Sequence, residues 1–111
     1  MEIQETRQGA VTVVRPQGPL ALGDAEQFKG VVEESIRRSL GRLVIDAAAI
    51  AYVDSRGLEV LVEASDSLSQ TGRALHVCGA NETIREVLHL TGLSDRFEHF
   101  EDVNSAVRSF L

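Results

Sequence analysis

The sequence is poor in cysteine, tryptophan and long apolar runs, and each shortage excludes a class of protein. Its single cysteine, Cys78, cannot form an internal disulfide or build a Cys-rich zinc site, and this usage fits a reducing compartment. No segment approaches the roughly 20 apolar residues of a membrane span, and residues 1–4 lack the basic and apolar blocks of a signal peptide. We therefore expect a cytoplasmic protein without direct membrane insertion.

Clusters of lysine and arginine are also missing. The chain carries 17 acidic and 11 basic residues, which gives a formal net charge of −6. Because neutralising phosphates takes clustered positive charge, nucleic acid is not an expected partner. The length of 111 residues suits one hydrophobic core, and with no tryptophan this core must rest on aliphatic side chains. We expect residues 1–111 to form a single domain.

The first half of the chain reads as a hairpin followed by a helix. Strand-forming residues gather in segments 2–7 and 10–16 around Gly9, which predicts two antiparallel strands. Asp24 is expected to cap a helix that closes at Gly41 and carries apolar residues at every fourth position. These inward positions are Phe28, Val32, Ile36 and Leu40.

The second half alternates short apolar runs with amphipathic segments. Residues 43–46, 74–78 and 97–100 are predicted strands, the first buried on both faces. Helices are predicted after Ser55, Asn81 and Asp102; the first of these ends near Gly72, and its inward face is predicted to hold Leu58, Leu61, Val62, Ser65 and Leu68. This order predicts an α/β fold with a mixed sheet of about five strands, parallel in its inner pairings and covered by about four helices.

The turn Asp54-Ser55-Arg56-Gly57-Leu58, where a strand leads into the second helix, is the candidate functional site. If the residue has only a structural role, the Ser55 hydroxyl caps the helix by accepting a hydrogen bond from a free backbone N–H of the first turn. Gly57 is a poor helix former, which indicates close approach by another backbone or by a phosphate. A phosphate on Ser55 would add about −1.5 to −2 charges to an already acidic surface and repel an acidic partner. The turn is therefore a plausible binding switch.

The exposed side of the second helix is the predicted contact patch beside Ser55. Val60 and Ala64 are expected to interrupt the acidic residues with modest apolar surface, and those acidic residues are Glu59, Glu63 and Asp66. Arg56 could pair with Asp54 or with a phosphate on Ser55, and the sequence does not choose between the two.

The turn and its surroundings resemble the STAS domain of bacterial anti-sigma factor antagonists. The likeness rests on Tyr52-Val53-Asp54-Ser55 followed by Gly57-Leu58, on the run Leu43 to Asp46, on Gly18-x-Leu20 and on the return from Gly72 to Cys78. It implies a domain without an active site that binds an anti-sigma factor, often a serine kinase. It also implies that Ser55 is the phosphoacceptor, that a serine phosphatase restores binding, and that Asp46 supports the site.

Three positions depart from the family pattern. Ala21 stands where an aspartate helps to engage the kinase, Arg56 replaces a usually small residue, and Glu59 replaces a glycine that lets the partner approach. These departures favour a different partner. A second hypothesis therefore keeps the fold but drops the switch, making the chain a constitutive adaptor, for example a small subunit of an ABC-type lipid transport system.

Enzymatic and metal-binding alternatives have little support in the sequence. His76, His89 and His99 share no metal-ligand spacing with one another or with Cys78, so neither a metal nor another cofactor is expected. Asp46 and Asp54 lie near strand ends and could be imagined as a catalytic carboxylate pair, but no set of His, Lys or Arg lies near them in sequence, so hydrogen bonding to loop amides is the favoured explanation. Ser55 lacks the Gly-x-Ser-x-Gly elbow of a nucleophile, and we expect no catalysis.

Overall fold

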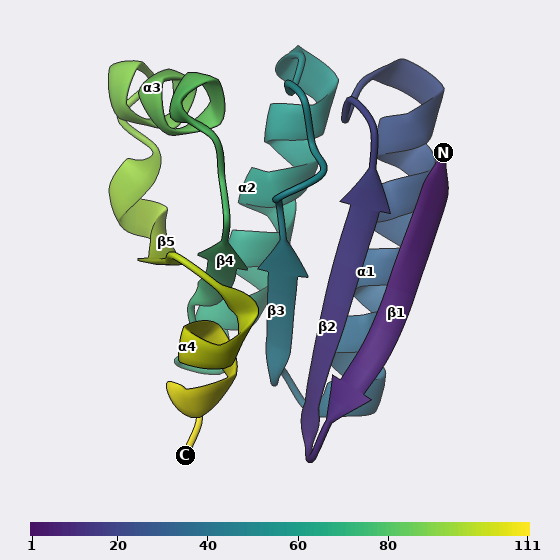
Figure 1. Ribbon diagram of the computed structural model, residues 1–111, viewed down its shortest axis with the longest axis vertical. Coiled ribbons are helices and arrows are strands. Elements are labelled where there is room, and N and C mark those ends of the chain that lie inside the picture. The colour runs from purple at the N-terminus through teal and green to yellow at the C-terminus, as the bar shows by residue number, and fades with distance from the viewer.

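The computed structural model describes all 111 residues and arranges them as one mixed sheet with helices on both faces (Figure 1). The elements are β1 (Glu2–Gln8), β2 (Val11–Gln17), α1 (Leu22–Ser39), β3 (Leu43–Asp46), α2 (Ser55–Ser69), β4 (Leu75–Cys78), α3 (Glu82–Leu90), the 3-10 turn η1 (Ser94–Arg96), β5 (Phe97–Phe100) and α4 (Val103–Arg108). The strand order β1-β2-β3-β4-β5 follows the chain. Only β1 is antiparallel to its neighbour, so the predicted hairpin, parallel inner pairings and α/β class are confirmed.

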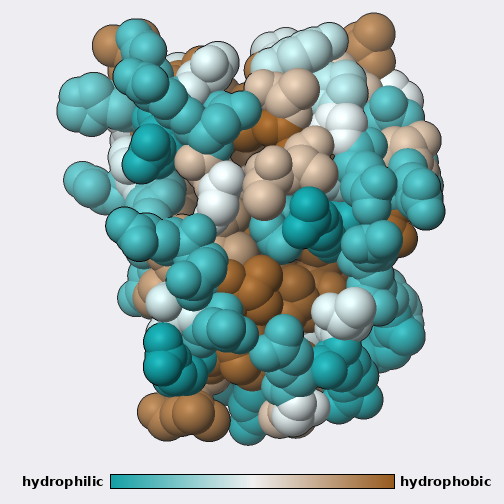
Figure 2. Space-filling view, in the orientation of Figure 1, coloured by the Kyte–Doolittle hydropathy of each residue, from teal (hydrophilic) through white to brown (hydrophobic).

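Two clusters of buried side chains fill the two faces of the sheet. The larger one, with 18 buried residues, lies between the sheet and the helices α1 and α2, and Phe28 and Leu68 are among its fully buried members. The smaller one lies between α4 and the opposite face, and it includes Cys78, as expected of a cysteine in a buried strand. Figure 2 shows apolar residues on this second face, which α4 covers only in part, surrounded by hydrophilic ones.

His76 in β4 joins the sheet to the C-terminal segment. Its ring stacks on Phe110 with centroids 4.1 Å apart and on Phe100 at 5.4 Å. Its Nδ1 lies 2.9 Å from the Ser109 hydroxyl, and its Nε2 lies 3.4 Å from a Glu98 carboxylate oxygen. Burial lowers the pKa of His76, against the opposing pull of Glu98. The histidine is therefore a packing residue of the α4 face.

Helix caps show which local predictions hold. Asn81 and Asp102 cap α3 and α4 through their side chains, as predicted. Asp24 does not cap α1; it lies within the first turn and accepts the N-terminal ammonium of Met1 at 3.2 Å. The prediction failed because α1 begins earlier, at Leu22, where a carboxylate from another loop supplies the cap.

The end of α1 corrects one predicted core position. Leu40 was expected to face inward, but it adopts a left-handed backbone conformation with φ 55° and its side chain is 71% exposed. Its N–H and that of Gly41 both bond to the carbonyl of Ile36, which closes the helix. Because the backbone turns at this point, the Leu40 side chain does not lie on the apolar face of α1 that holds Phe28 and Val32.

Candidate functional site

Asp54, and not Ser55, caps the helix α2. Its backbone is extended, with φ −94° and ψ −174°, and its Oδ1 accepts the N–H of Gly57 at 2.8 Å. Ser55 is the first helical residue and is exposed. The expected Ser55 cap is therefore wrong, because the cap position needs a non-helical backbone that only the preceding residue has. The consequence is that the Ser55 hydroxyl stays outside the capping interaction.

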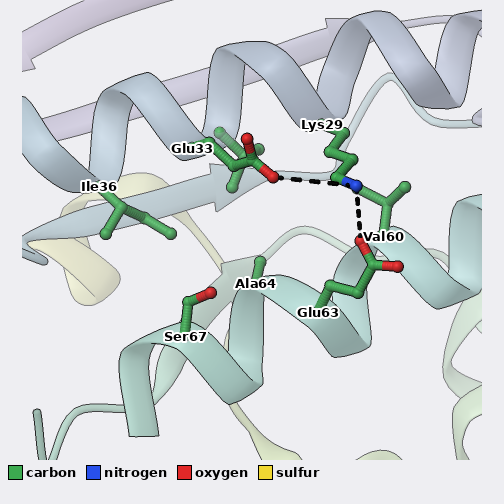
Figure 3. A pocket seen from close by; sticks show the side chains of 8 residues that line it. Lys29, Glu33, Ile36, Val60, Glu63, Ala64 and Ser67 are labelled. Carbon is green, nitrogen blue, oxygen red and sulfur yellow. Dashed lines mark ion pairs between the residues drawn. The ribbon is translucent and has the colours of Figure 1, made fainter. Parts of the chain in front are cut away.

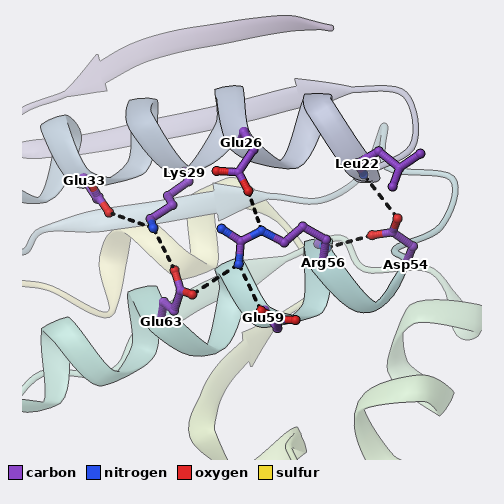
Figure 4. Close-up of polar contacts among 9 residues, drawn as sticks. Leu22, Glu26, Lys29, Glu33, Asp54, Arg56, Glu59 and Glu63 are labelled. Atoms are coloured by element: carbon purple, nitrogen blue, oxygen red, sulfur yellow. Dashed lines mark hydrogen bonds and ion pairs between the residues drawn. The ribbon is translucent and has the colours of Figure 1, made fainter.

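The second oxygen of Asp54 reaches across to the start of α1. Oδ2 accepts the N–H of Leu22 at 3.2 Å, so one carboxylate caps two helices (Figure 4). Around it the two loops are paired by backbone: Leu20 donates to Tyr52 at 2.9 Å, Asp54 donates to Leu20 at 3.2 Å, and Leu20 and Val53 form a parallel bridge. The loop before α1 and the loop before α2 therefore behave as one structural unit.

Gly57 explains how closely these loops approach. A Cβ atom at this position would lie 2.2 Å from the carbonyl oxygen of Leu20, much closer than any normal contact. Close approach was predicted from the glycine, and the approaching group is the chain's own backbone. Gly57 is buried, so it positions the site and offers no surface to a partner.

The predicted contact patch needs a correction at two of its residues. Val60 is 1% exposed and Ala64 is 7% exposed, so neither contributes apolar surface. Figure 3 shows both side chains pointing toward α1, beside Lys29 and Ile36. The expectation failed because α2 packs against α1 as well as against the sheet, which widens its buried face beyond the single stripe predicted.

The exposed apolar surface beside Ser55 comes from other residues. An open depression of about 320 Å³ is lined by Ser55, Leu58, Glu59, Val62, Glu63 and Leu93. Leu58 and Val62, both predicted for the inward face, are half-buried and follow Ser55 at spacings of three and seven residues. That helical spacing was a signal for this surface. Leu93 had no such signal, because it comes from the turn after α3.

Arg56 faces the other side of α2, toward α1. Its guanidinium bonds to Glu26 at 2.5 Å, Glu59 at 3.0 Å and Glu63 at 3.3 Å, while Lys29 lies 3.4 Å from Glu63 (Figure 4). The hydrogen bond between Arg56 and Glu26 raises the pKa of the arginine and lowers that of the carboxylate. Of the two alternatives for Arg56, pairing with Asp54 is not seen, since Asp54 accepts hydrogen bonds from the backbone amides of Leu22 and Gly57.

Asp46 and Asp54 have separate structural roles. Asp46 is 5% exposed; it accepts the N–H of Ala48 at 3.1 Å and pairs with Arg15 at 3.2 Å on the face that α4 covers. Asp54 binds the amides of Leu22 and Gly57. Hydrogen bonding to loop amides is thus confirmed for both carboxylates. No group of three or more His, Cys, Asp or Glu side chains is arranged to hold a metal ion.

No helix of the protein combines the length and the apolar character that crossing a bilayer requires.

Comparison with known proteins relates nearly the whole chain to one group. RsfB, an anti-sigma-F factor antagonist of Mycobacterium tuberculosis, is 27% identical over 97 residues, which are 87% of this chain and 79% of RsfB. A solved structure from Thermotoga maritima, described as an anti-sigma factor antagonist, matches with a TM-score of 0.88 at 21% identity, covering 96% of this chain and 92% of that one.

SpoIIAA, an anti-sigma factor antagonist, is similar in both of its solved forms. The unphosphorylated form matches with a TM-score of 0.74 at 14% identity, covering 98% of this chain and 96% of SpoIIAA. The phosphorylated Bacillus form has the same TM-score at 17% identity, covering 99% and 100%. These solved structures share the fold. Because the STAS domain model matches residues 2–106, nearly the whole chain, the protein belongs to the STAS domain family.

Proposed function

We propose that this protein is an anti-sigma factor antagonist that binds an anti-sigma factor through the surface around Ser55 and is switched off by phosphorylation of that serine. The partner is an anti-sigma factor of the serine kinase type, and a serine phosphatase reverses the modification in the cytoplasm. Relatives named anti-sigma factor antagonists support the partner class. The family is non-enzymatic, which agrees with the expectation that the chain has no catalysis of its own.

The observation that carries the proposal is the exposed Ser55 beside the apolar depression. Asp54 does the capping, so a modification of the Ser55 hydroxyl removes no cap from α2. Leu58, Val62 and Leu93 supply apolar contact area next to that hydroxyl. A partner covering the depression would therefore lie directly against Ser55, and a phosphate there would have to be buried with it.

The local charges determine how a phosphate on Ser55 acts. The free amides at the start of α2 favour a negative group, so the fold tolerates it. The nearest cation, Arg56, is already bonded to three glutamates, including Glu59 one turn along from Ser55. The modification thus adds about −1.5 to −2 charges to a surface whose positive charge is already neutralised, and it repels a partner carrying acidic groups.

The test is phosphorylation by the partner kinase with ATP, followed by mass spectrometry to locate the phosphate. We expect one phosphate, on Ser55, absent in Ser55→Ala and retained in Ser67→Ala, the matched exposed serine of the same helix. Ser55→Asp should keep the fold and lose binding to the anti-sigma factor. Labelling at another serine, or full binding by Ser55→Asp, would contradict the switch.

A constitutive adaptor is the second candidate, and the charged surface beside Ser55 favours it. Arg56 and Glu59 form an ion pair on α2, at positions where small residues would admit a partner more closely. Ala21, at the start of α1, offers no side-chain group to a kinase. An adaptor would bind its partner, for example the ATPase of a lipid transporter, equally well as wild type and as Ser55→Asp. The neighbouring genes would encode a permease and an ATPase.

A further inference from the structure

A polar pocket lies between the last turns of α1 and the hairpin of β1 and β2 (Figure 1). Its volume is about 210 Å³, and four residues line it, none of them apolar: Glu5, Arg7, Thr12 and Arg38. The Ser55 surface adjoins the other end of α1, and a helix of 18 residues is about 27 Å long. The pocket is therefore separate from the candidate site described above.

The strand register explains why these side chains share one pocket. Arg7 pairs with Thr12 across the hairpin, so both side chains leave the same face of the sheet. Glu5 lies on that face too, because side chains two residues apart along a strand point the same way. This face is the one that α1 covers, and Arg38 of α1 completes the lining.

Glu5 is held in place by partners on α1. It accepts the Ser35 hydroxyl at 2.8 Å, and Arg38 Nη2 lies 2.9 and 3.2 Å from its two carboxylate oxygens. Ser35 is fully buried, and its carbonyl accepts the hydroxyl of Ser39, which is 4% exposed, at 2.6 Å. Hydrogen-bonded polar side chains thus replace the apolar core at this end of the helix.

The pocket also holds polar groups that are not used within the chain. Thr12 is 6% exposed, yet its hydroxyl makes no hydrogen bond; because no fully buried side-chain oxygen of the protein lacks a partner, this hydroxyl must open into the pocket. Arg7 forms no ion pair, and the ion pairs of Arg38 run through Nη2 and Nε, which leaves Nη1 unused. Two guanidinium groups line the pocket with one carboxylate, so it has one positive charge in excess, in a chain whose formal charge is −6.

We propose that this pocket binds a small tetrahedral oxyanion, either free phosphate or the phosphate group of a small monoester. Arg7 and Nη1 of Arg38 donate charge-assisted hydrogen bonds to it, and the Thr12 hydroxyl donates a third. These donors come from β1, α1 and β2, an arrangement that suits oxygens pointing in several directions better than a planar carboxylate. The volume lies below the roughly 300–1,000 Å³ of sites for drug-sized ligands, which restricts the occupant to a small group. The inference does not depend on the proposed function, because it uses no residue of the Ser55 surface.

The test is a titration of the wild-type chain with sodium phosphate, followed by amide NMR and by thermal unfolding, with sodium chloride holding the ionic strength constant. We expect saturable shifts confined to β1, β2 and the end of α1, a dissociation constant in about the millimolar range, and a melting temperature raised by a few degrees. Glycerol 3-phosphate distinguishes the two sources: tighter binding than that of phosphate indicates a monoester, and weaker binding indicates the free ion. Equal shifts with chloride or acetate, or shifts only elsewhere in the chain, would overturn the proposal.

Variants separate binding from a structural role of the same residues. Arg7→Gln should weaken phosphate binding by about tenfold or more, whereas Arg85→Gln, which changes an exposed arginine of α3 that also lacks an ion pair, should leave it unchanged. Thr12→Val replaces only the hydroxyl, so it should weaken binding about tenfold while the melting temperature without phosphate stays at or above that of the wild type. A Thr12→Val variant that melts lower without phosphate, or unchanged binding by Arg7→Gln, would refute the assignment.

Discussion

Replacing Gly57 by alanine tests whether the paired loops are as rigid as their contacts indicate. Alanine is the better helix former, by up to about 1 kcal/mol. The new methyl group, however, would lie 2.2 Å from the Leu20 carbonyl oxygen, and that carbonyl accepts the N–H of Asp54. Overpacking typically costs about 1–3 kcal/mol, and the upper end of about 3 kcal/mol applies here because the group that must move is backbone. The steric term wins, and we expect a net loss of about 2 kcal/mol.

The assay is equilibrium unfolding in urea, with thermal unfolding as a second readout. The expected loss lowers the melting temperature by about 8 °C in a domain of this size. Gly30→Ala is the matched control, because Gly30 lies exposed within α1, where an added methyl group would meet no other part of the chain within 4 Å, and it should stabilise the protein by about 0.5–1 kcal/mol. A Gly57→Ala variant as stable as wild type would refute the reasoning, since the loops would then separate at little cost.

Three further predictions follow from single side chains. Asp54→Ala should lose about 1–3 kcal/mol, because it removes a cap from each of two helices, whereas Asp54→Asn should lose less, since one amide oxygen can still accept from Gly57; urea unfolding ranks the two. Burial holds the pKa of His76 below its ordinary 6.5, so on acidification the unfolded chain binds the proton before the folded protein does, and the free energy of unfolding should fall as the pH drops below about 6.5. In unfolding titrations at several pH values, His76→Phe should reduce this dependence on pH, and an unchanged dependence would contradict the assignment. Burial, with the nearby Asp46, raises the pKa of Cys78 to about 12, so a thiol reagent at about pH 8 should react only after unfolding, and rapid labelling of the native protein would count against this.

The strands and most caps could be predicted because their signals are local. The apolar run before Asp46 is short and β-branched, as a strand buried on both faces requires, and it is buried throughout. Asn81 and Asp102 satisfy amides three residues along the chain, so nothing distant is needed to place them.

Two of the errors involve partners far away in sequence. Asp54 caps α1 from 32 residues away, and no periodicity near Asp24 contains that information. Val60 became buried because α1 packs beside α2, and a hydrophobic stripe read from one helix does not reveal a second neighbour. Ser55 was predicted as the central residue, but the sequence could not show which of the two adjacent residues, Asp54 or Ser55, has the extended backbone and therefore caps the helix.

The strand order has a consequence for how the protein is made. Because β1 to β5 lie side by side in the order of the chain, each strand pairs with the one synthesised before it. During synthesis each new strand therefore adds to the edge of the sheet already formed, and no later strand has to insert between two earlier ones. Such a fold can form from its N-terminal strands onward during translation, with α4 packing over β3, β4 and β5 once it has been synthesised.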